Sequence, residues 1–206
     1  MKPARFIVFE GLDGSGKSTQ LNMLREHMQN LQIPVAAAFE PSDSNAAGRL
    51  ARDVIKRKEI LSGEALALVF AADRAEHLQT EIIPLLDRGI NVLCDRYVYS
   101  NLAYQNGDVP LNLLIEYNRA SIEKRMPDAV FFIDTPPSVC VSRMEAGRDG
   151  QPELFETAEK LASVRNCYIK AFEETGNYIK VTMIDGYRPK EKVFSDVWKK
   201  INCLFK

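Results

Sequence analysis

Residues 11–18 constrain the fold of this chain more than any other segment, because they read Gly-Leu-Asp-Gly-Ser-Gly-Lys-Ser. This segment satisfies the phosphate-loop pattern G-x-x-x-x-G-K-[ST] at every fixed position. An apolar segment typical of a buried strand precedes it at residues 5–10, and apolar residues at helical spacing follow it from Leu21 to Leu31. A strand, a glycine-rich loop and a helix in this order predict a nucleotide-binding loop.

The residue types of this loop suit a phosphate ligand. Glycines let successive backbone N–H groups close around an anion, and the positive end of the following helix faces the same point. The Lys17 ammonium would meet the β- and γ-phosphate oxygens, and the Ser18 hydroxyl would bind Mg²⁺. A chance match by a glycine-rich turn is the alternative, expected in roughly one chain in a hundred. The predicted ATP-binding residues of the loop are Gly11, Leu12, Asp13, Gly14, Ser15, Gly16, Lys17 and Ser18.

Composition limits the class of partner. The 206 residues include 27 Lys and Arg against 28 Asp and Glu, which argues against a sequence-independent nucleic-acid binder and favours a small anionic ligand. No apolar run approaches the ~18 residues of a membrane span, so we expect a cytoplasmic protein. No Ser/Gly/Pro-rich linker divides the chain, which predicts one α/β domain over residues 1–206.

Polar residues follow two further apolar segments. The predicted strand at 34–39 leads into Glu40-Pro41-Ser42-Asp43, and the strand at 90–94 leads into Asp95-Arg96-Tyr97. Ligands collect at the carboxyl ends of parallel strands, so both segments are candidates for the wall of a binding cleft. A surface salt bridge is the alternative for Asp95 and Arg96, but beside a phosphate loop a carboxylate can steer Mg²⁺ while a guanidinium clamps a phosphoryl group.

The remaining pattern is mainly helical. We expect helices over residues 46–58, 63–88, 110–125 and 153–174, strands over 130–134 and 178–184, and a terminal helix striped by Val193, Val197, Ile201 and Leu204. Arg52 suits either a solvated helix face or a phosphate contact. Phe70 and Arg74 share a helix face at i, i+4 spacing, as a planar base would require, although Phe at such spacing is often plain core.

A charged, glycine-punctuated segment at about residues 143–153 predicts a lid. Arg143 and Arg148 could close over a bound triphosphate and exclude water. One well-placed arginine accelerates phosphoryl transfer by roughly 10³- to 10⁵-fold. The alternative for this segment is an ordinary surface loop.

The chain resembles the thymidylate kinase family from end to end. Residues 9–20, which read Phe-Glu-Gly-Leu-Asp-Gly-Ser-Gly-Lys-Ser-Thr-Gln, are similar to its opening signature. Residues 70–74 (Phe-Ala-Ala-Asp-Arg) and 95–104 (Asp-Arg-Tyr-Val-Tyr-Ser-Asn-Leu-Ala-Tyr) resemble its two internal blocks, which are more specific than the phosphate loop. The resemblance implies a three-layer P-loop NTPase-type fold with a five-stranded parallel sheet, of the nucleoside monophosphate kinase kind with a lid, in a homodimer. It also implies Mg²⁺-dependent conversion of ATP and dTMP to ADP and dTDP, a step in dTTP biosynthesis.

Further roles come from the resemblance residue by residue. It implies that Phe70 stacks on thymine, that Arg74 bonds the edge of the base, and that Ser100 and Asn101 approach the base. Tyr104 would crowd the 2′ position of the sugar. Asp13 would hold the 3′-hydroxyl or the metal shell, and Arg96 the monophosphate.

The chain departs from the family pattern at two places. Some members carry a basic residue at the position of Gly14, whereas this sequence resembles the members that supply arginine from the lid. The catalytic role would then fall to Arg148, with Arg143 against adenine. Many bacterial members read Arg-Glu-Pro-Gly where residues 39–42 of this chain read Phe-Glu-Pro-Ser, which leaves the residue that contacts the monophosphate open, with Arg52 as one candidate.

Two other functions are compatible with the sequence. A deoxynucleoside kinase, or another pyrimidine nucleoside monophosphate kinase, shares the phosphate loop and the Asp-Arg pair, and a deoxynucleoside kinase would need a general base such as Glu40. A phosphate-loop switch would bind nucleotide without phosphorylating a small acceptor.

Overall fold

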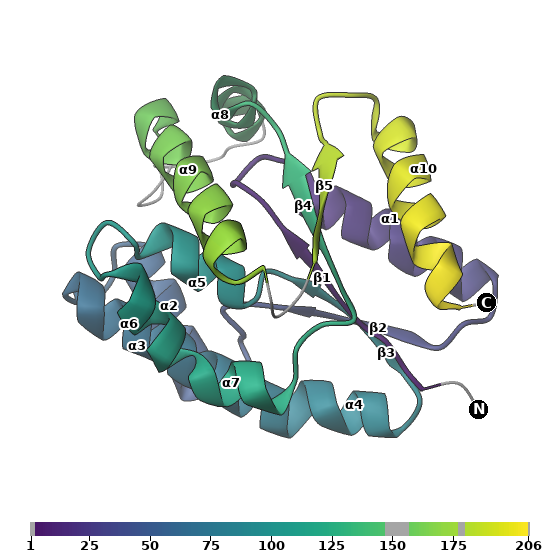
Figure 1. Cartoon of the computed structure of the whole chain (residues 1–206), viewed down its shortest axis with the longest axis horizontal. Coiled ribbons are helices and arrows are strands. Elements are labelled where there is room, and N and C mark those ends of the chain that lie inside the picture. Colours follow the sequence, from purple (N-terminus) through teal and green to yellow (C-terminus); the bar gives the residue numbers. More distant parts are fainter. Residues whose placement is uncertain (1–2, 147–156, 177–179, 206) are drawn as a thin grey trace.

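A parallel five-stranded sheet forms the centre of the protein in the computed structural model, which describes residues 3–146, 157–176 and 180–205. The strand order is β2-β3-β1-β4-β5, and every neighbouring pair is parallel (Figure 1). The predicted parallel α/β fold is therefore confirmed. The strands are β1 (Phe6–Glu10), β2 (Val35–Phe39), β3 (Asn91–Asp95), β4 (Ala129–Asp134) and β5 (Val181–Asp185).

Helices cover both faces of the sheet and produce three layers (Figure 1). One face packs against α1 and α10, and the other lies against the group that includes α5 and α9. The α-helices are α1 (Lys17–Asn30), α2 (Ala46–Ile55), α3 (Gly63–His77), α4 (Ile83–Asp87), α5 (Val98–Tyr104), α6 (Leu111–Tyr117), α7 (Arg119–Lys124), α8 (Pro137–Ala146), α9 (Ala158–Glu174) and α10 (Lys190–Ile201). A π-helical turn, η1 (Leu78–Ile82), joins α3 to α4, and a 3₁₀ turn, η2 (Asn202–Leu204), follows α10.

Successive side chains of β1 point to opposite faces of the sheet, so this strand contributes to the core on both sides. Phe6 and Val8 face the cluster formed with α5 and α9, whereas Ile7 and Phe9 face the cluster formed with α1 and α10. All four side chains are fully buried, as expected for the middle strand of a parallel sheet. The central position of β1 brings the phosphate loop, which follows it directly, to the middle of one sheet edge.

The structure corrects several of the predicted helices, and the one predicted over 46–58 ends at Ile55. The helix predicted over 63–88 is interrupted by η1, because Pro84 has no N–H for the i→i−4 ladder and a wider turn precedes it. The helix predicted over 110–125 is two helices separated at Asn118. Leu31, predicted on the buried face of the first helix, instead lies just beyond its end and is exposed.

Parts of the predicted lid lie outside the described residues. The structure describes Arg143 at the end of α8 but not Arg148 or the other residues of 147–156. The predicted helix over 153–174 is described from Thr157, whose side chain accepts a hydrogen bond from the Lys160 N–H and caps α9. Among the described residues, no helix combines the length and apolar character needed to span a membrane.

Candidate active site

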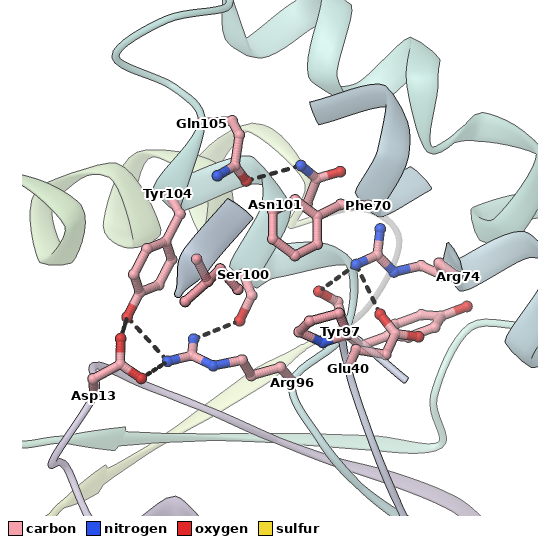
Figure 2. Close-up of a pocket in the computed structure, with 12 residues that line it drawn as sticks. Asp13, Glu40, Phe70, Arg74, Arg96, Tyr97, Ser100, Asn101, Tyr104 and Gln105 are labelled. Atoms are coloured by element: carbon pink, nitrogen blue, oxygen red, sulfur yellow. Dashed lines mark hydrogen bonds and ion pairs between the residues drawn. The ribbon is translucent and has the colours of Figure 1, made fainter. Parts of the chain in front are cut away.

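Two adjoining hollows lie at the carboxyl ends of the strands. The first, which we call the nucleoside pocket, is lined by Asp13, Glu40, Pro41, Ile55, Phe70, Arg74, Arg96, Tyr97, Ser100, Asn101, Tyr104 and Gln105 (Figure 2). The second, the phosphate-loop pocket, is lined by residues 13–20 together with Ile133, Arg143, Gly186, Arg188, Lys190 and Val193. Asp13 lines both hollows, so the two open onto one shared point.

Backbone geometry explains the glycines of the phosphate loop. Gly14 and Gly16 have φ of 76° and 101°, which is left-handed backbone that other residues rarely adopt. A Cβ at Gly14 would also lie 2.4 Å from the Cys140 carbonyl oxygen on α8. A basic side chain at this position is therefore incompatible with this packing of α8 against the loop.

Lys17 is a buried cation of the phosphate-loop pocket. Its side chain is buried, and its Nζ donates to the Leu12 carbonyl oxygen at 2.9 Å. Burial, together with the Arg96 charge, lowers the pKa of Lys17, and the carboxylates of Asp95, Asp13 and Glu10 oppose this shift. Phosphate oxygens entering the pocket would replace the carbonyl as its partner.

Ser18 and Asp95 provide oxygen ligands that suit Mg²⁺. The Ser18 hydroxyl on α1 donates to the Asp95 carboxylate, which ends β3, at 2.5 Å. A hydroxyl and a carboxylate beside a phosphate site match the preference of Mg²⁺ for few protein oxygens supplemented by phosphate and water. These residues fit the ion.

Arg96 lies where the two hollows meet. Its Nη2 donates to the Asp13 carboxylate at 2.5 Å and to the Tyr104 hydroxyl at 3.0 Å, while Tyr104 itself donates to Asp13 at 2.8 Å (Figure 2). Burial would raise the pKa of Asp13, but the charges of Arg96 and Lys17 outweigh it and lower this pKa to about 2. Asp13 is therefore ionised at neutral pH and held between two cations.

A buried polar cluster supports Arg96 from behind. The Arg96 Nη1 donates to the Ser100 hydroxyl at 2.9 Å and to the Tyr168 hydroxyl at 3.2 Å. Both hydroxyls also contact the Glu10 carboxylate, at 2.6 Å and 3.0 Å. Burial raises the pKa of Glu10, while its bonds to these hydroxyls and the Arg96 charge oppose the rise. Elements β1, α5 and α9 thus fix the orientation of one guanidinium.

Arg74 is the buried cation of the opposite end of the nucleoside pocket. Its Nη2 lies 2.8 Å from a Glu40 carboxylate oxygen and donates to the Tyr97 carbonyl oxygen at 3.1 Å, and its Nη1 donates to the Asn118 side-chain oxygen. Phe70, one helical turn before Arg74, is half-buried and lines the same pocket (Figure 2). An aromatic face and a guanidinium therefore share one hollow, as their spacing predicts.

Most predicted site residues line one of the two hollows, with four exceptions: Gly11, Leu12, Arg52 and Arg148. Asp13, Phe70, Arg74, Arg96, Ser100, Asn101 and Tyr104 all line the nucleoside pocket. Arg143 lies beside the phosphate loop, where its Nη1 donates to the Ser15 carbonyl oxygen at 3.2 Å. Arg52 does not line either hollow: its Nε pairs with Asp43 at 2.6 Å and it donates to the Pro41 carbonyl oxygen. Arg148 lies outside the described residues.

Four buried polar residues in or behind the site were not predicted from the sequence, and one of them, Gln105, lines the nucleoside pocket. Glu10 ends a buried strand and is itself fully buried, a signal that its charge serves the site. Tyr168 and Asn118 lie on or between amphipathic helices and had no distinguishing sequence pattern. Only the contacts made in the folded chain separate them from ordinary helix residues.

Comparisons with known proteins agree with this geometry. The family model described as thymidylate kinase matches residues 9–197. The thymidylate kinase of Plasmodium falciparum (isolate 3D7) is 35% identical over 98% of this chain and 92% of its own length. That of Leptospira interrogans (serovar copenhageni, strain Fiocruz L1-130) is 38% identical over 93% and 90%, and that of Fervidobacterium nodosum is 34% identical over 96% and 98%. This chain belongs to the thymidylate kinase family.

Proposed function

We propose that the protein transfers the γ-phosphoryl group of ATP to the phosphate of dTMP, giving ADP and dTDP. The observation that carries this proposal is the junction of a phosphate-loop pocket and a nucleoside pocket at Asp13 and Arg96. Two nucleotides that enter these hollows would meet with their phosphates facing each other. Positioning and charge neutralisation are the main sources of catalysis in such a transfer.

The proposed mechanism is an in-line displacement in which no side chain acts as a nucleophile. An oxygen of the dTMP phosphate forms a bond to the γ-phosphorus while the bond to the bridging oxygen of ADP breaks. Lys17 binds the donor phosphates and Arg96 binds the acceptor phosphate, so both cations offset the charge on the transferring group. Ser18 and Asp95 would hold Mg²⁺, which when bound neutralises charge on the donor phosphates.

The nucleoside pocket offers a partner to each part of dTMP. We propose that Phe70 stacks on the base while Arg74, Ser100 and Asn101 approach its edge. Tyr104 donates to Asp13 and lies close to Arg96, where it would crowd a ribose 2′-hydroxyl. Apart from Arg96, Arg52 is the candidate for a monophosphate contact after it leaves Asp43.

ATP, the phosphoryl donor, would bind at the end of the site formed by the phosphate-loop pocket. Arg143 bridges the phosphate loop and the segment after β5, because its Nη2 also donates to the Gly186 carbonyl oxygen at 3.2 Å. We propose that adenine lies against this guanidinium and that Arg148 approaches the transferring phosphoryl group. We also propose that the enzyme acts as a cytoplasmic homodimer.

A deoxynucleoside kinase is the alternative that the geometry favours less. It needs a base to deprotonate the 5′-hydroxyl, and Glu40 is the candidate. The Glu40 carboxylate lies against Arg74 at 2.8 Å and His77 at 3.6 Å. Within the described residues no hydrogen bond or ion pair joins it to Arg96 or to the phosphate loop.

A coupled assay of ADP release tests the proposed function directly. We expect turnover with dTMP, some turnover with dUMP, and none above background with thymidine. The dUMP activity follows because one methyl group in an apolar pocket is worth only ~1–3 kcal/mol. Turnover of thymidine at the rate of dTMP would support the deoxynucleoside kinase, and no ADP release with any acceptor would support a nucleotide-binding switch.

A further inference from the structure

We propose that Asn118 sets the hydrogen-bonding polarity of the nucleoside pocket and thereby selects thymine and uracil over cytosine. This inference rests on the proposed function, since it takes a pyrimidine base to lie beside Arg74 and Asn101. Asn118 does not itself line the pocket. It is a positioning residue that acts through two residues that do.

Four buried side chains form a hydrogen-bonded relay along the pocket. Arg74 Nη1 donates to Asn118 Oδ1, Asn118 Nδ2 donates to Asn101 Oδ1 at 2.8 Å, and Asn101 Nδ2 donates to Gln105 Oε1 at 3.0 Å. Each of the four residues is at most 2% exposed. Solvent therefore has little access to exchange with these bonds, and each partner must satisfy the next.

The direction of the relay follows from chemistry that does not depend on how an amide is assigned. A guanidinium has only donors, so the atom of Asn118 that faces Arg74 must be the oxygen. The Asn118 Nδ2 also donates to the Leu114 carbonyl oxygen at 2.8 Å, and a carbonyl can only accept. Two independent partners thus give Asn118 one orientation. Asn101 must then accept from it, which leaves its own Nδ2 to donate to Gln105.

The relay decides which hydrogen-bonding groups are left for a ligand. Arg74 Nε is a buried donor with no partner among the described residues. Asn101 Oδ1 keeps a second lone pair, and Gln105 Nε2 donates no hydrogen bond within the described residues. Asn101 lies between Gln105 and Arg74 in Figure 2, and Gln105 turns its oxygen toward Asn101, so the groups left at this end of the pocket are an acceptor on Asn101 and a donor on Arg74.

The Arg74 donor and the Asn101 acceptor complement thymine and uracil but not cytosine. The edges of thymine and uracil present a carbonyl beside an N–H, which pair with a donor and an acceptor. Cytosine presents an amino donor where thymine has its O4 acceptor, and an unprotonated nitrogen acceptor beside it. Cytosine therefore leaves both positions mismatched, and unpaired buried polar groups are strongly disfavoured.

The substitution Asn118→Asp tests this inference because it should reverse the relay. A carboxylate still accepts from Arg74 but cannot donate, so Asn101 must turn its Nδ2 toward residue 118 and its Oδ1 toward Gln105, which turns in response. We expect the ratio of kcat/KM for dTMP to that for dCMP to fall about 100-fold. The ratio for dTMP to dUMP should stay constant, since these two bases share one edge.

A matched control and a second variant complete the experiment. Asn112→Asp adds the same charge to the exposed side of α6 and should leave both ratios unchanged. Asn118→Leu keeps a similar volume without a polar atom and covers the case in which a buried carboxylate prevents folding. In Asn118→Leu no side-chain amide orients Asn101, so the ratio of kcat/KM for dTMP to that for dCMP should fall about 10-fold.

The result that would overturn the inference is a folded residue-118 variant that loses activity equally toward dTMP and dCMP, because that indicates a purely structural role. Equal turnover of dTMP and dCMP by the unmodified enzyme would also overturn it. Failure of the proposed function is a different result, namely no phosphorylation of dTMP by the unmodified enzyme.

Discussion

Arg96 shows how strictly single residues are constrained in this site. It adopts φ of 73°, which is unusual for a residue with a side chain, and its backbone N–H donates to the Phe9 carbonyl oxygen of β1 at 2.8 Å. Such backbone costs free energy of the order of 1–2 kcal/mol and is retained where function requires it. Here it directs the guanidinium toward Asp13 at the junction of the two hollows.

Gly14 provides a prediction at the scale of one residue. Gly14→Ala combines a left-handed backbone with a Cβ 2.4 Å from the Cys140 carbonyl oxygen, so the loop or α8 must shift. We expect the free energy of unfolding to fall by about 2–3 kcal/mol and KM for ATP to rise about 10-fold. Urea denaturation and steady-state kinetics measure the two effects.

Gly89 supplies the control for that substitution. Its φ of 78° is similar, but a Cβ there would have no heavy atom within 4 Å. Gly89→Ala should therefore cost only about 1 kcal/mol and leave KM for ATP unchanged. Equal effects of the two substitutions would show that contact with α8 does not determine the shape of the phosphate loop.

At the scale of elements, the sequence predicted which segments form helices and strands better than it predicted where the helices end and which residues they contact. The apolar segments after Gly89 and Asp128 identified β3 and β4, because strands buried on two faces carry continuous apolar side chains. The division of 110–125 at Asn118 was not predictable, since helical periodicity continues across it. Asn118 is held there by bonds from its side chain to neighbouring elements, which a sequence pattern does not reveal.

Helix α9 contributes to the site through one hydroxyl, which leads to a prediction at this scale. Tyr168→Phe removes the contacts of α9 with Glu10, Ser100 and Arg96 and leaves the ring in place. We expect kcat to fall about 10-fold, because a hydrogen bond to a charged group contributes roughly 1.5–3 kcal/mol. KM for ATP should not change, since Tyr168 does not line the phosphate-loop pocket.

Tyr117→Phe is the matched control for that variant. It also removes one tyrosine hydroxyl bond between elements, from α6 to the exposed Glu64 carboxylate on α3 at 2.6 Å. We expect kcat of this variant to equal that of the unmodified enzyme. An unchanged kcat in Tyr168→Phe would show that Arg96 needs no support from α9.

At the scale of the whole molecule, the strand order explains why distant motifs meet. Strand β1 lies between β3 and β4, so the phosphate loop and the Asp95-Arg96 segment end at adjacent points of one edge. The motifs at residues 11–18, 70–74 and 95–104 contain about half of the residues that line the two hollows. They could not predict Glu10 or Tyr168 behind Arg96, because burial of these groups depends on packing between β1, α5 and α9.

The kinetic effect of Arg96→Ala is the measurement that tests the central claim most directly, namely that the two hollows bring two nucleotide phosphates together at Arg96. Arg165→Ala, which removes an arginine paired with Asp134 at 2.6 Å outside both hollows, is the control. In a coupled assay with ATP and dTMP, we expect kcat to fall about 10³-fold or more in Arg96→Ala and to stay within about two-fold in Arg165→Ala. A kcat near that of the unmodified enzyme in Arg96→Ala would contradict the account.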